Sequence, residues 1–369
     1  MHIVTNAKQL TDCLEIVEKV LPVRSTLPVI SNILFEVNQD CLTFSATNLE
    51  MFIKVKMDYQ GNETGKILLP PKIVDIMRYF PTDEVDIEIN WDNYRLGISG
   101  GTAQFHLYGS DHEDYPTSFE SQSDQQPGFS IEQVKFKKAL KSVAFAASNE
   151  ETRPAFNGIL LSFKENRFSL TASDTYRLAI NDARDDKWSF DEKKALVPAR
   201  SLRELLRILS DNNDPVTLIN QDNILAFKFD RIYFASRLLE EKYPDVSGVI
   251  PGEYKTRIII DRKQLEDTIS RSALLAEGKN QAVNIIVKEG HLEVRVSGQQ
   301  GSMEEIIPVE QEGEDLDLFV NTRFVLDILK ILEDNKITID FHGEGGPLIF
   351  RLVDDQSYLY LVLPIKKIN

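Results

Sequence analysis

The sequence predicts an α+β fold of three similar domains. The first indication is a six-residue pattern of an acid, two apolar residues, a base, any residue and an apolar residue, found at Asp75–Phe80, Glu204–Leu209 and Asp327–Leu332. The copies begin roughly 125 residues apart, which is too long for a solenoid repeat and suits a whole domain. The second indication is that each third repeats one order of expected strands and helices. We therefore predict domains at residues 1–125, 126–250 and 251–369.

Each third is expected to open with a short strand and an amphipathic helix. In the first third these are His2–Thr5 and Ala7–Leu21, where Leu10, Leu14 and Val17 recur at helical spacing. The corresponding pairs are Gly128–Ile131 with Val134–Ala147, and Arg257–Ile260 with Gln264–Ala276. Each helix should bury its apolar stripe against a sheet.

Two further strands should follow, and then the helix that carries the repeated pattern. The strands are expected at Ser31–Phe35 and Leu42–Ala46, Asn157–Leu161 and Phe168–Ala172, and Val283–Val287 and Leu292–Ser297. The pattern helix is clearest in Val197–Leu209, where a strand end runs into a helix. Its expected buried stripe is Leu202, Leu205, Leu206 and Leu209.

Three strands are expected to close each third. Apolar and polar residues alternate in them, as in antiparallel strands with one buried face. They are predicted at Val85–Ile89, Tyr94–Ile98 and Phe105–Tyr108, at Val216–Ile219, Ile224–Phe229 and Ile232–Leu238, and at Ile337–Phe341, Leu348–Leu352 and Tyr358–Val362. Two segments rich in polar residues, proline or glycine are the expected linkers, Tyr115–Pro127 and Tyr243–Tyr254.

Length and composition indicate a folded chain. The apolar fraction of 42% in 369 residues is enough for two or three domain cores. The amino terminus lacks the pattern of a signal peptide, and no apolar run approaches the roughly 18 residues of a membrane span. The two cysteines, Cys13 and Cys41, suit a reducing compartment better than a disulfide scaffold, so we expect a cytoplasmic protein.

Charge is distributed unevenly along the chain. A net charge of −16 argues against a nucleic-acid-binding protein, whose usual binding surface is basic. However, the net charge of the six predicted helical segments together is about +5, which leaves a net charge of about −21 for the rest of the chain. These segments are 6–24, 70–80, 132–148, 198–209, 261–276 and 321–334. An ordinary solvated face explains any single helix. The contrast across all six favours a positive surface that attracts a polyanion without reading its sequence, although the last third contributes almost nothing to it.

Motifs of catalysis, metal binding and nucleotide binding are missing from the sequence. No two of the five histidines share metal-ligand spacing on a helix, and there is no CxxC, GxGxxG, GxxxxGK[ST] or GxSxG. Gly100-Gly101 and Gly343–Gly346 lie between strand segments and are expected to form hairpin turns. The sequence therefore predicts no metal, cofactor or catalytic residue and favours a non-enzymatic scaffold. A hydrolase whose site assembles only in space remains an alternative.

Six segments together resemble one protein family. In chain order they are Arg24–Asn32, Ala46–Met51, Asn157–Leu160, Thr171–Ala179, Tyr243–Asp245 and Leu363-Pro364. They are similar to the bacterial sliding clamps, the beta subunits of DNA polymerase III, and the resemblance runs the full length of the chain. It implies three DNA-clamp domains per chain, each with two helices packed on antiparallel sheets, and a head-to-tail homodimer that closes as a ring around double-stranded DNA.

The same resemblance implies a function and partners. A sliding clamp is a processivity factor that holds DNA by topology, so its contacts with DNA are weak and independent of sequence. The expected partners are the replicative polymerase, the clamp loader, and other polymerases and repair proteins that carry short clamp-binding peptides. The alternative from another class is a peptide-binding adaptor that does not form a ring or encircle DNA.

The resemblance also implies three sets of site residues. The DNA-binding set comprises Arg24, Arg153 and Arg200 by position in the family, and Arg78, Lys138, Lys141, Arg203 and Arg207 by placement on helices. The peptide-binding pocket comprises Phe156, Ser173, Thr175, Tyr176, Arg177, Leu178, Pro244, Val249, Leu361, Val362, Leu363, Pro364 and Ile365. The dimer interface places Phe105 and Leu107 against Leu274 and Leu275, with Lys72 near Glu304 or Glu305.

Overall fold

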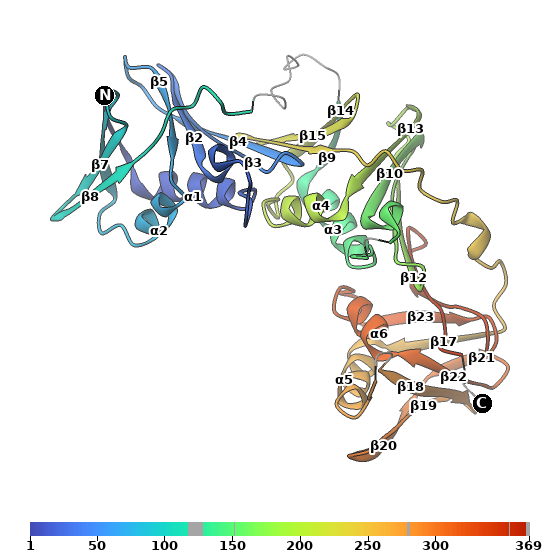
Figure 1. The fold of residues 1–369 in the computed structure, drawn as a ribbon. Helices are drawn as coiled ribbons and strands as arrows, with labels where there is room; N and C mark the ends of the chain where they lie inside the picture. Colours follow the sequence, from blue (N-terminus) through green and yellow to red (C-terminus); the bar gives the residue numbers. More distant parts are fainter. Residues whose placement is uncertain (117–127, 151, 279–280, 354, 367–369) are drawn as a thin grey trace. The chain divides into compact units, whose positions relative to one another are not determined.

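The computed structural model describes residues 1–116, 128–150, 152–278, 281–353 and 355–366. Among these residues the α-helices are α1 (Ala7–Glu18), α2 (Lys72–Arg78), α3 (Gln133–Ala144), α4 (Ala199–Leu206), α5 (Arg262–Ala273) and α6 (Thr322–Leu329) (Figure 1). Each lies within one of the six predicted helical segments. Three 3-10 helices are η1 (Pro28–Ser31), η2 (Pro154–Asn157) and η3 (Ser247–Val249). No helix in the described ranges is long and apolar enough to cross a membrane.

Three of the helices begin at a polar residue that also ends a strand. The side chains of Asn6 and Asp261 accept hydrogen bonds from the backbone N–H groups of Gln9 and Gln264, and Asn321 caps α6 in the same way. Such caps satisfy N–H groups that have no partner inside the helix. The chain can therefore pass from a strand directly into a helix.

The chain forms two compact units, and the middle third contributes to both. One unit comprises residues 1–137 with 203–238, and the other comprises residues 138–202 with 239–369. Helices α3 and α4 each have residues in both units. Of the two predicted linkers, the first falls largely on residues 117–127, outside the described residues, and the second contains η3.

An eight-stranded antiparallel sheet lies in the first unit. Its strands, in spatial order, are β5 (Gly65–Leu69), β2 (Ile33–Val37), β3 (Cys41–Thr47), β4 (Met51–Asp58), β16 (Ile232–Arg237), β15 (Ile224–Phe229), β14 (Pro215–Gln221) and β9 (Phe129–Glu132). Strands β4 and β16 are neighbours, with Ile53 opposite Phe234. Phe52, Ile219, Ala226 and Ala235 form one buried cluster across this pairing. The first and middle thirds therefore share a sheet and an apolar core.

A nine-stranded antiparallel sheet lies in the second unit. Its strands, in spatial order, are β13 (Phe190–Pro198), β10 (Gly158–Glu165), β11 (Arg167–Ser173), β12 (Arg177–Arg184), β25 (Tyr358–Val362), β24 (Leu348–Leu352), β23 (Lys336–Phe341), β17 (Thr256–Asp261) and β21 (Glu310–Gly313). Strands β12 and β25 are neighbours, with Ala179 opposite Tyr360. The middle and last thirds are thus joined by backbone hydrogen bonds as well.

Each unit also contains one four-stranded antiparallel sheet. In the first unit the spatial order is β1 (His2–Asn6), β6 (Glu84–Asn90), β7 (Arg95–Gly100) and β8 (Ala103–Tyr108). In the second unit it is β20 (Gly301–Pro308), β19 (His291–Gly298), β18 (Ala282–Lys288) and β22 (Leu316–Asn321). Strands β8 and β20 each form an edge of their sheet.

The predicted order of elements is incomplete. Each third has additional strands between its second predicted strand and its pattern helix. They are β4 and β5 in the first third, β12 and β13 in the middle third, and β20, β21 and β22 in the last third. Periodicity does not identify β13, because it is an edge strand on which the run Asp191–Lys194 is exposed. The predicted stripe of α4 is largely confirmed, since Leu202, Leu205 and Leu209 are buried and Leu206 is half-buried.

Replacing Phe52 by alanine should destabilise the first unit. The ring is 2% exposed and packs in the cluster shared by the first and middle thirds. A truncation of this kind lowers the free energy of unfolding by about 3–5 kcal/mol. Urea unfolding followed by circular dichroism measures the change. Tyr79→Ala is the matched control, because that ring is 87% exposed and its removal should cost about 0.5 kcal/mol or less. Equal effects would contradict the assigned core.

Candidate nucleic-acid and peptide sites

Arg78, a predicted DNA-binding residue on α2, is surrounded by carboxylates. Its Nε donates to Glu15 at 2.8 Å, its Nη2 donates to Glu18, and its Nη1 lies 3.4 Å from Asp75. The hydrogen bonds to Glu15 and Glu18 raise the pKa of the Arg78 guanidinium. Its positive charge is therefore largely offset within the chain, and the side chain ties α2 to α1.

Lys19 and Arg207 form a second group of cations in the first unit. The Nζ of Lys19 donates to the backbone carbonyl of Arg207 at 3.3 Å, beyond the end of α4. Burial lowers the pKa of Lys19, although Glu15 and Glu204 oppose the shift. Arg207 is exposed and contacts Glu204, three residues earlier on α4, at 3.1 Å. The sequence pattern did not single out Lys19, because only the fold brings it to Arg207.

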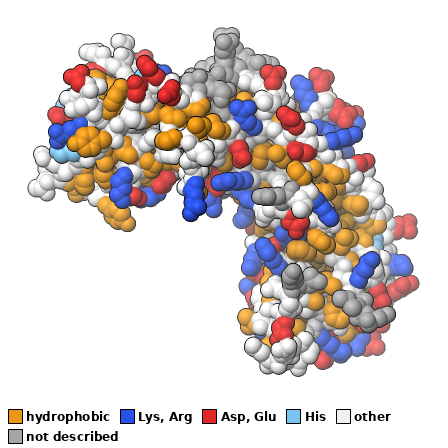
Figure 2. All heavy atoms as spheres, viewed as in Figure 1, with side chains coloured by type: hydrophobic (Ala, Val, Ile, Leu, Met, Phe, Trp, Pro, Cys, Tyr) orange, Lys and Arg blue, Asp and Glu red, His pale blue; other side chains and the backbone are white. Residues whose placement is uncertain are grey.

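The remaining members of the predicted DNA-binding set differ in exposure. Arg24, between α1 and η1, is exposed, and Arg203 on α4 is half-buried. In the second unit Lys138, Lys141, Arg153 and Arg200 are all exposed. Basic and acidic side chains are interspersed on the face drawn in Figure 2, so the net charge of −16 is not a uniformly acidic surface there. Exposed cations of this kind can contact phosphates without reading bases.

The turn between β11 and β12 carries several predicted pocket residues in a fixed conformation. Thr175 has a backbone φ of +78°, a value that side-chain-bearing residues rarely adopt. Ser173 Oγ accepts from the Thr175 N–H at 3.1 Å and donates to the Arg177 carbonyl at 2.7 Å. Asp174 accepts from the N–H groups of Tyr176 and Arg177. The turn is therefore preorganised, and it leaves the Tyr176 ring 58% exposed.

The carboxyl-terminal segment is attached at two points. The Leu363 N–H donates to the Tyr176 carbonyl at 2.9 Å, and the Ile365 N–H donates to the Phe319 carbonyl at 2.7 Å. These bonds hold Pro364 between the β11–β12 turn and β22. The Leu363 side chain is 42% exposed. Residues 367–369 lie outside the described residues.

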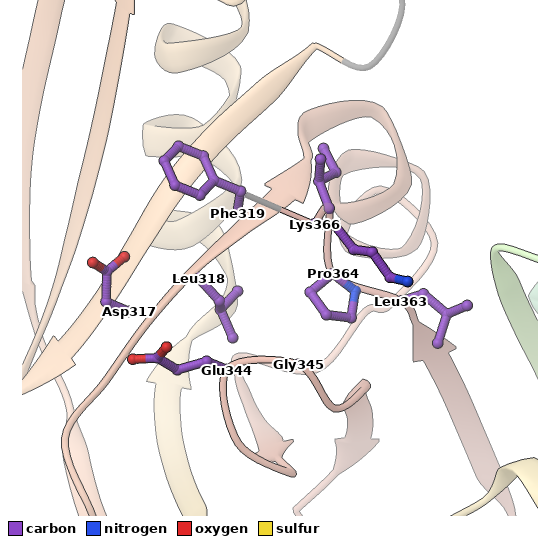
Figure 3. A pocket seen from close by; sticks show the side chains of 9 residues that line it. Asp317, Leu318, Phe319, Glu344, Gly345, Leu363, Pro364 and Lys366 are labelled. Atoms are coloured by element: carbon purple, nitrogen blue, oxygen red, sulfur yellow. The ribbon is translucent and has the colours of Figure 1, made fainter. Parts of the chain in front are cut away.

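A pocket of about 460 Å³ lies against this segment. Leu363, Pro364 and Ile365 belong to the predicted set and line it (Figure 3). The sequence did not predict its other lining residues, which are Asp317, Leu318, Phe319, Glu344, Gly345 and Lys366. They come from β22, from the turn after β23 and from the tail, so no local pattern connects them. In Figure 3 the carboxylates of Asp317 and Glu344 lie on one side and Leu363 on the other.

The other predicted pocket residues fall into a buried group beneath the surface and an exposed group on it. Leu178 and Leu361 pack with Ile349 and Leu359 in a buried apolar cluster. Ser173 and Val362 are buried as well. Phe156 contacts the ring of Tyr243 edge to face at 5.7 Å. Pro244 and Val249 are exposed, as are Tyr176 and Leu363, and together these side chains offer apolar surface beside polar backbone.

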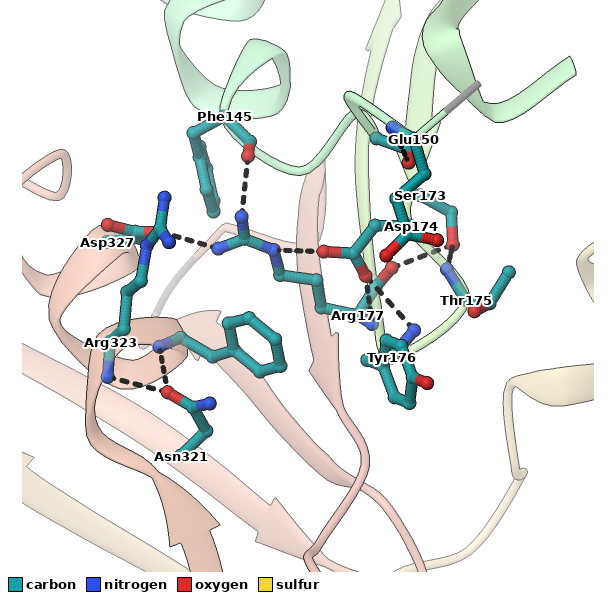
Figure 4. A network of polar contacts seen from close by, with 12 residues as sticks. Phe145, Glu150, Ser173, Asp174, Thr175, Tyr176, Arg177, Asn321, Arg323 and Asp327 are labelled. Carbon is teal, nitrogen blue, oxygen red and sulfur yellow. Dashed lines mark hydrogen bonds and ion pairs between the residues drawn. The ribbon is translucent and has the colours of Figure 1, made fainter. Parts of the chain in front are cut away.

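Arg177 is a buried supporting residue. Its guanidinium donates to Asp174 at 2.9 Å, to Asp327 at 2.6 Å and to the Phe145 carbonyl at 2.9 Å (Figure 4). It also lies 4.6 Å from the ring centroid of Phe324. These contacts connect β12 to α6, so the role of Arg177 is to position the turn that carries Thr175 and Tyr176. Arg153 reaches the same turn, because its Nη1 donates to Thr175 Oγ1 at 2.6 Å.

The predicted dimer residues lie on and beside the two sheet edges. Phe105 and Leu107 on β8 are half-buried, and Phe105 lies 6.4 Å from the ring of Phe80. Leu274, after α5, is 83% exposed, and Leu275 is half-buried. The charged members already have partners within the chain: Lys72 contacts Asp75, Glu304 contacts Arg295, and Glu305 accepts from Arg271 and Thr268.

Comparison with known proteins gives a consistent result along the whole chain. Family models of the DNA polymerase III beta subunit match its N-terminal domain to residues 1–118, its central domain to 130–245 and its C-terminal domain to 247–366. A Beta sliding clamp from Bacillus subtilis (strain 168) is 30% identical over 371 residues, which is 97% of each chain. The chain belongs to the DNA polymerase III beta subunit family.

Solved structures of family members share the fold. The DNA polymerase sliding clamp from Bacillus subtilis superposes with a TM-score of 0.93 at 28% identity and full coverage of both chains. The sliding clamp from Pseudomonas aeruginosa bound to griselimycin superposes with a TM-score of 0.92 at 26% identity, over 99% of each chain. These likenesses confirm the predicted family and α+β clamp fold. They favour a sliding clamp over the alternative of a non-ring adaptor.

The network around Arg177 should make this beta subunit sensitive to loss of Asp327. In Asp327→Ala the buried guanidinium of Arg177 would keep the carboxylate of Asp174 but lose that of Asp327. This loss should lower the free energy of unfolding by about 3 kcal/mol. Chemical denaturation measures the effect. Asp75→Ala is the control, because the Asp75 side chain, 49% exposed, contacts Lys72 and Arg78 at the surface, and its loss should change stability little. Similar effects of the two substitutions would contradict the supporting role.

Proposed function

We propose that this beta subunit pairs with a second copy to form a ring around double-stranded DNA. The observation that carries the proposal is the presence of two sheet edges, β8 and β20, beside exposed apolar residues. An edge strand offers unpaired N–H and C=O groups to another chain. Leu274 and Ile306 are exposed in the second unit, while Phe105 and Leu107 line β8 in the first. A head-to-tail contact between β8 of one copy and β20 of the other would cover both edges.

We also propose three domains, with the boundaries predicted at residues 1–125, 126–250 and 251–369. The matches of the three family models support this division. The strand pairings β4–β16 and β12–β25 would then act as rigid connections between domains, because several backbone hydrogen bonds join the two strands of each pairing. Rigid joints suit a ring, since a closed circle requires a defined angle between successive domains.

The proposed DNA contacts are electrostatic. The exposed cations that would face the phosphates are Arg24, Lys138, Lys141, Arg200 and Arg207, and the half-buried Lys19 would add to them beside Arg207. Arg78 would contribute less, because three carboxylates offset its charge. Phosphate contacts without base contacts permit sliding, because every register along the duplex has a similar energy.

The proposed partners are replication and repair proteins that carry a short apolar peptide. The support is the apolar surface formed by Tyr176, Val249 and Leu363, next to the pocket along the carboxyl-terminal segment. An extended peptide could place its side chains there while its backbone meets the polar groups of the rim. We propose binding rather than catalysis as the activity of the chain, in the cytoplasm, as its family membership implies.

Retention on circular DNA tests the ring. The protein, loaded by its clamp loader onto nicked circular duplex, should remain bound during gel filtration and should dissociate when a restriction enzyme linearises the circle. Leu274→Glu should abolish retention by placing a charge in the contact between copies, yet it should leave peptide affinity unchanged. Equal loss from circular and linear DNA would refute encirclement and favour the adaptor.

Substitution of exposed pocket residues tests the peptide site. Leu363→Asp and Tyr176→Ser should each weaken a fluorescent clamp-binding peptide from the cognate polymerase by at least about tenfold, as expected for apolar residues central to an interface. Fluorescence anisotropy measures the affinity. Tyr79→Ser, which also removes an exposed ring, is the matched control and should bind the peptide normally. Unchanged affinity in both pocket variants would refute the assigned site.

A further inference from the structure

A cluster of metal-ligand side chains lies on one face of the four-stranded sheet of the first unit. His2 is on β1, and Asp86 and Glu88 are on β6. One ligand atom from each of the three side chains lies within 4.8 Å of the other two. The cluster is separate from the DNA, peptide and dimer residues discussed above, and no function has been given to it.

The pairing of β1 with β6 holds these residues in place. His2 is directly opposite Glu88, and the register runs through five residue pairs in all, ending with Asn6 opposite Glu84. Asp86 lies two residues from Glu88 and so projects from the same face of the sheet. The His2 Nε2 lies 2.7 Å from Asp86 Oδ1. The backbones of two paired strands therefore bring an imidazole and two carboxylates together.

Interactions of the amino terminus restrict His2 further. The His2 N–H donates to Glu63 Oε2 at 3.0 Å. The Met1 amino group donates to the Ile89 carbonyl at 2.9 Å and lies 3.7 Å from Glu63. Glu63 thus adds a third carboxylate near the cluster. The surroundings of the imidazole are strongly acidic, which favours a bound cation.

A second histidine lies in the same row across the sheet. Glu88 is opposite Gly97 on β7, and Gly97 is opposite His106 on β8. A Cβ at Gly97 would lie 3.7 Å from the Glu88 Cβ and 3.8 Å from the His106 Nδ1. Position 97 has no side chain, so the Glu88 Cβ and the His106 Nδ1 border the same space in this row. This arrangement is independent of the contact between His2 and Asp86.

The types of ligand indicate the class of metal. Ca²⁺ and Mg²⁺ prefer oxygen ligands alone, whereas imidazole nitrogen combined with carboxylate oxygen suits Zn²⁺ and related first-row cations. Three protein ligands leave a coordination position for water or for a fourth side chain. The side chains of His2 and Asp86 are 56% and 41% exposed, so an ion can reach them from solvent.

We propose that His2, Asp86 and Glu88 bind one divalent first-row transition cation of the Zn²⁺ class, with His106 as the fourth ligand. Bound metal would link β1 to β6 and, through His106, to the edge strand β8. Phe105 and Leu107 flank His106 on that strand, so the metal would also stiffen the edge proposed to contact a second copy. Metal binding itself does not depend on the proposed function.

Zinc titration of the metal-stripped, full-length chain by isothermal calorimetry tests the proposal. We expect one ion per chain, and Asp86→Asn and Glu88→Gln should each weaken the affinity at least about tenfold. His112→Gln is the matched control, because His112 also lies beside a carboxylate, Asp111, at 3.4 Å, and this variant should bind zinc normally. Circular dichroism confirms that each variant is folded.

The Glu88 variant also separates the proposed site from simple chelation by the amino terminus. A chelate of the Met1 amine and the His2 imidazole would not need Glu88, so normal zinc affinity in Glu88→Gln would refute the site. A rise in the thermal midpoint on addition of zinc, present in the native chain and lost in Asp86→Asn, is the second supporting readout. Unchanged affinity in His106→Gln would refute the fourth ligand.

Discussion

Antiparallel pairing between β12 and β25 is the interaction on which the proposed peptide site depends. Arg177 is opposite Val362 at one end of this pairing, so the β11–β12 turn and the carboxyl-terminal segment leave the sheet side by side. The bond from the Leu363 N–H to the Tyr176 carbonyl continues the same alignment by one more step. A shift of one residue in this register would turn Leu178 and Leu361 out of the buried cluster and disperse the site.

The buried charge of Arg177 reinforces this pairing. A guanidinium inside a protein is stable only when its donors are matched, and here two carboxylates, a carbonyl and two aromatic rings surround it. Asp327 comes from the repeated six-residue pattern, where it is the acidic first residue. In the other copies that position is Asp75, which contacts Lys72 and Arg78, and Glu204, which contacts Arg207. The repeated acidic residue thus forms ion pairs with residues of its own helix region in the first two thirds, whereas in the last third it pairs with the buried Arg177.

The three thirds are therefore alike in fold and unequal in charge. Arg78, Arg207 and Lys330 occupy the same position of the pattern. Arg78 contacts three carboxylates, whereas Arg207 contacts one, Glu204, and has Lys19 beside its carbonyl. A positive surface on an otherwise acidic chain depends on such differences, because each unpaired cation contributes to the field and each internal ion pair removes one. The repeated architecture makes equivalent helices, and under the proposed function local carboxylates would decide which of them attract DNA.

The sequence by itself determined the elements that depend on local order. The 3.6-residue periodicity, as in Leu10, Leu14 and Val17 of α1, and the repeated six-residue pattern identified the six α-helices of the described residues, and alternation identified the closing strands. The family came from motifs that are contiguous in sequence, and the candidate site residues came from that resemblance and from placement on helices. Tertiary structure decided what each residue does, because burial and pairing join positions far apart. It buried Arg177 in a network that supports the β11–β12 turn, and it placed carboxylates against the positive charge of Arg78. It also placed Lys19 beside Arg207. It also brought Glu344 and Phe319 to the tail, and His2 to Asp86 and Glu88. Most of these contacts join residues that are far apart in the sequence, so the packing of helices and the register between strands create them.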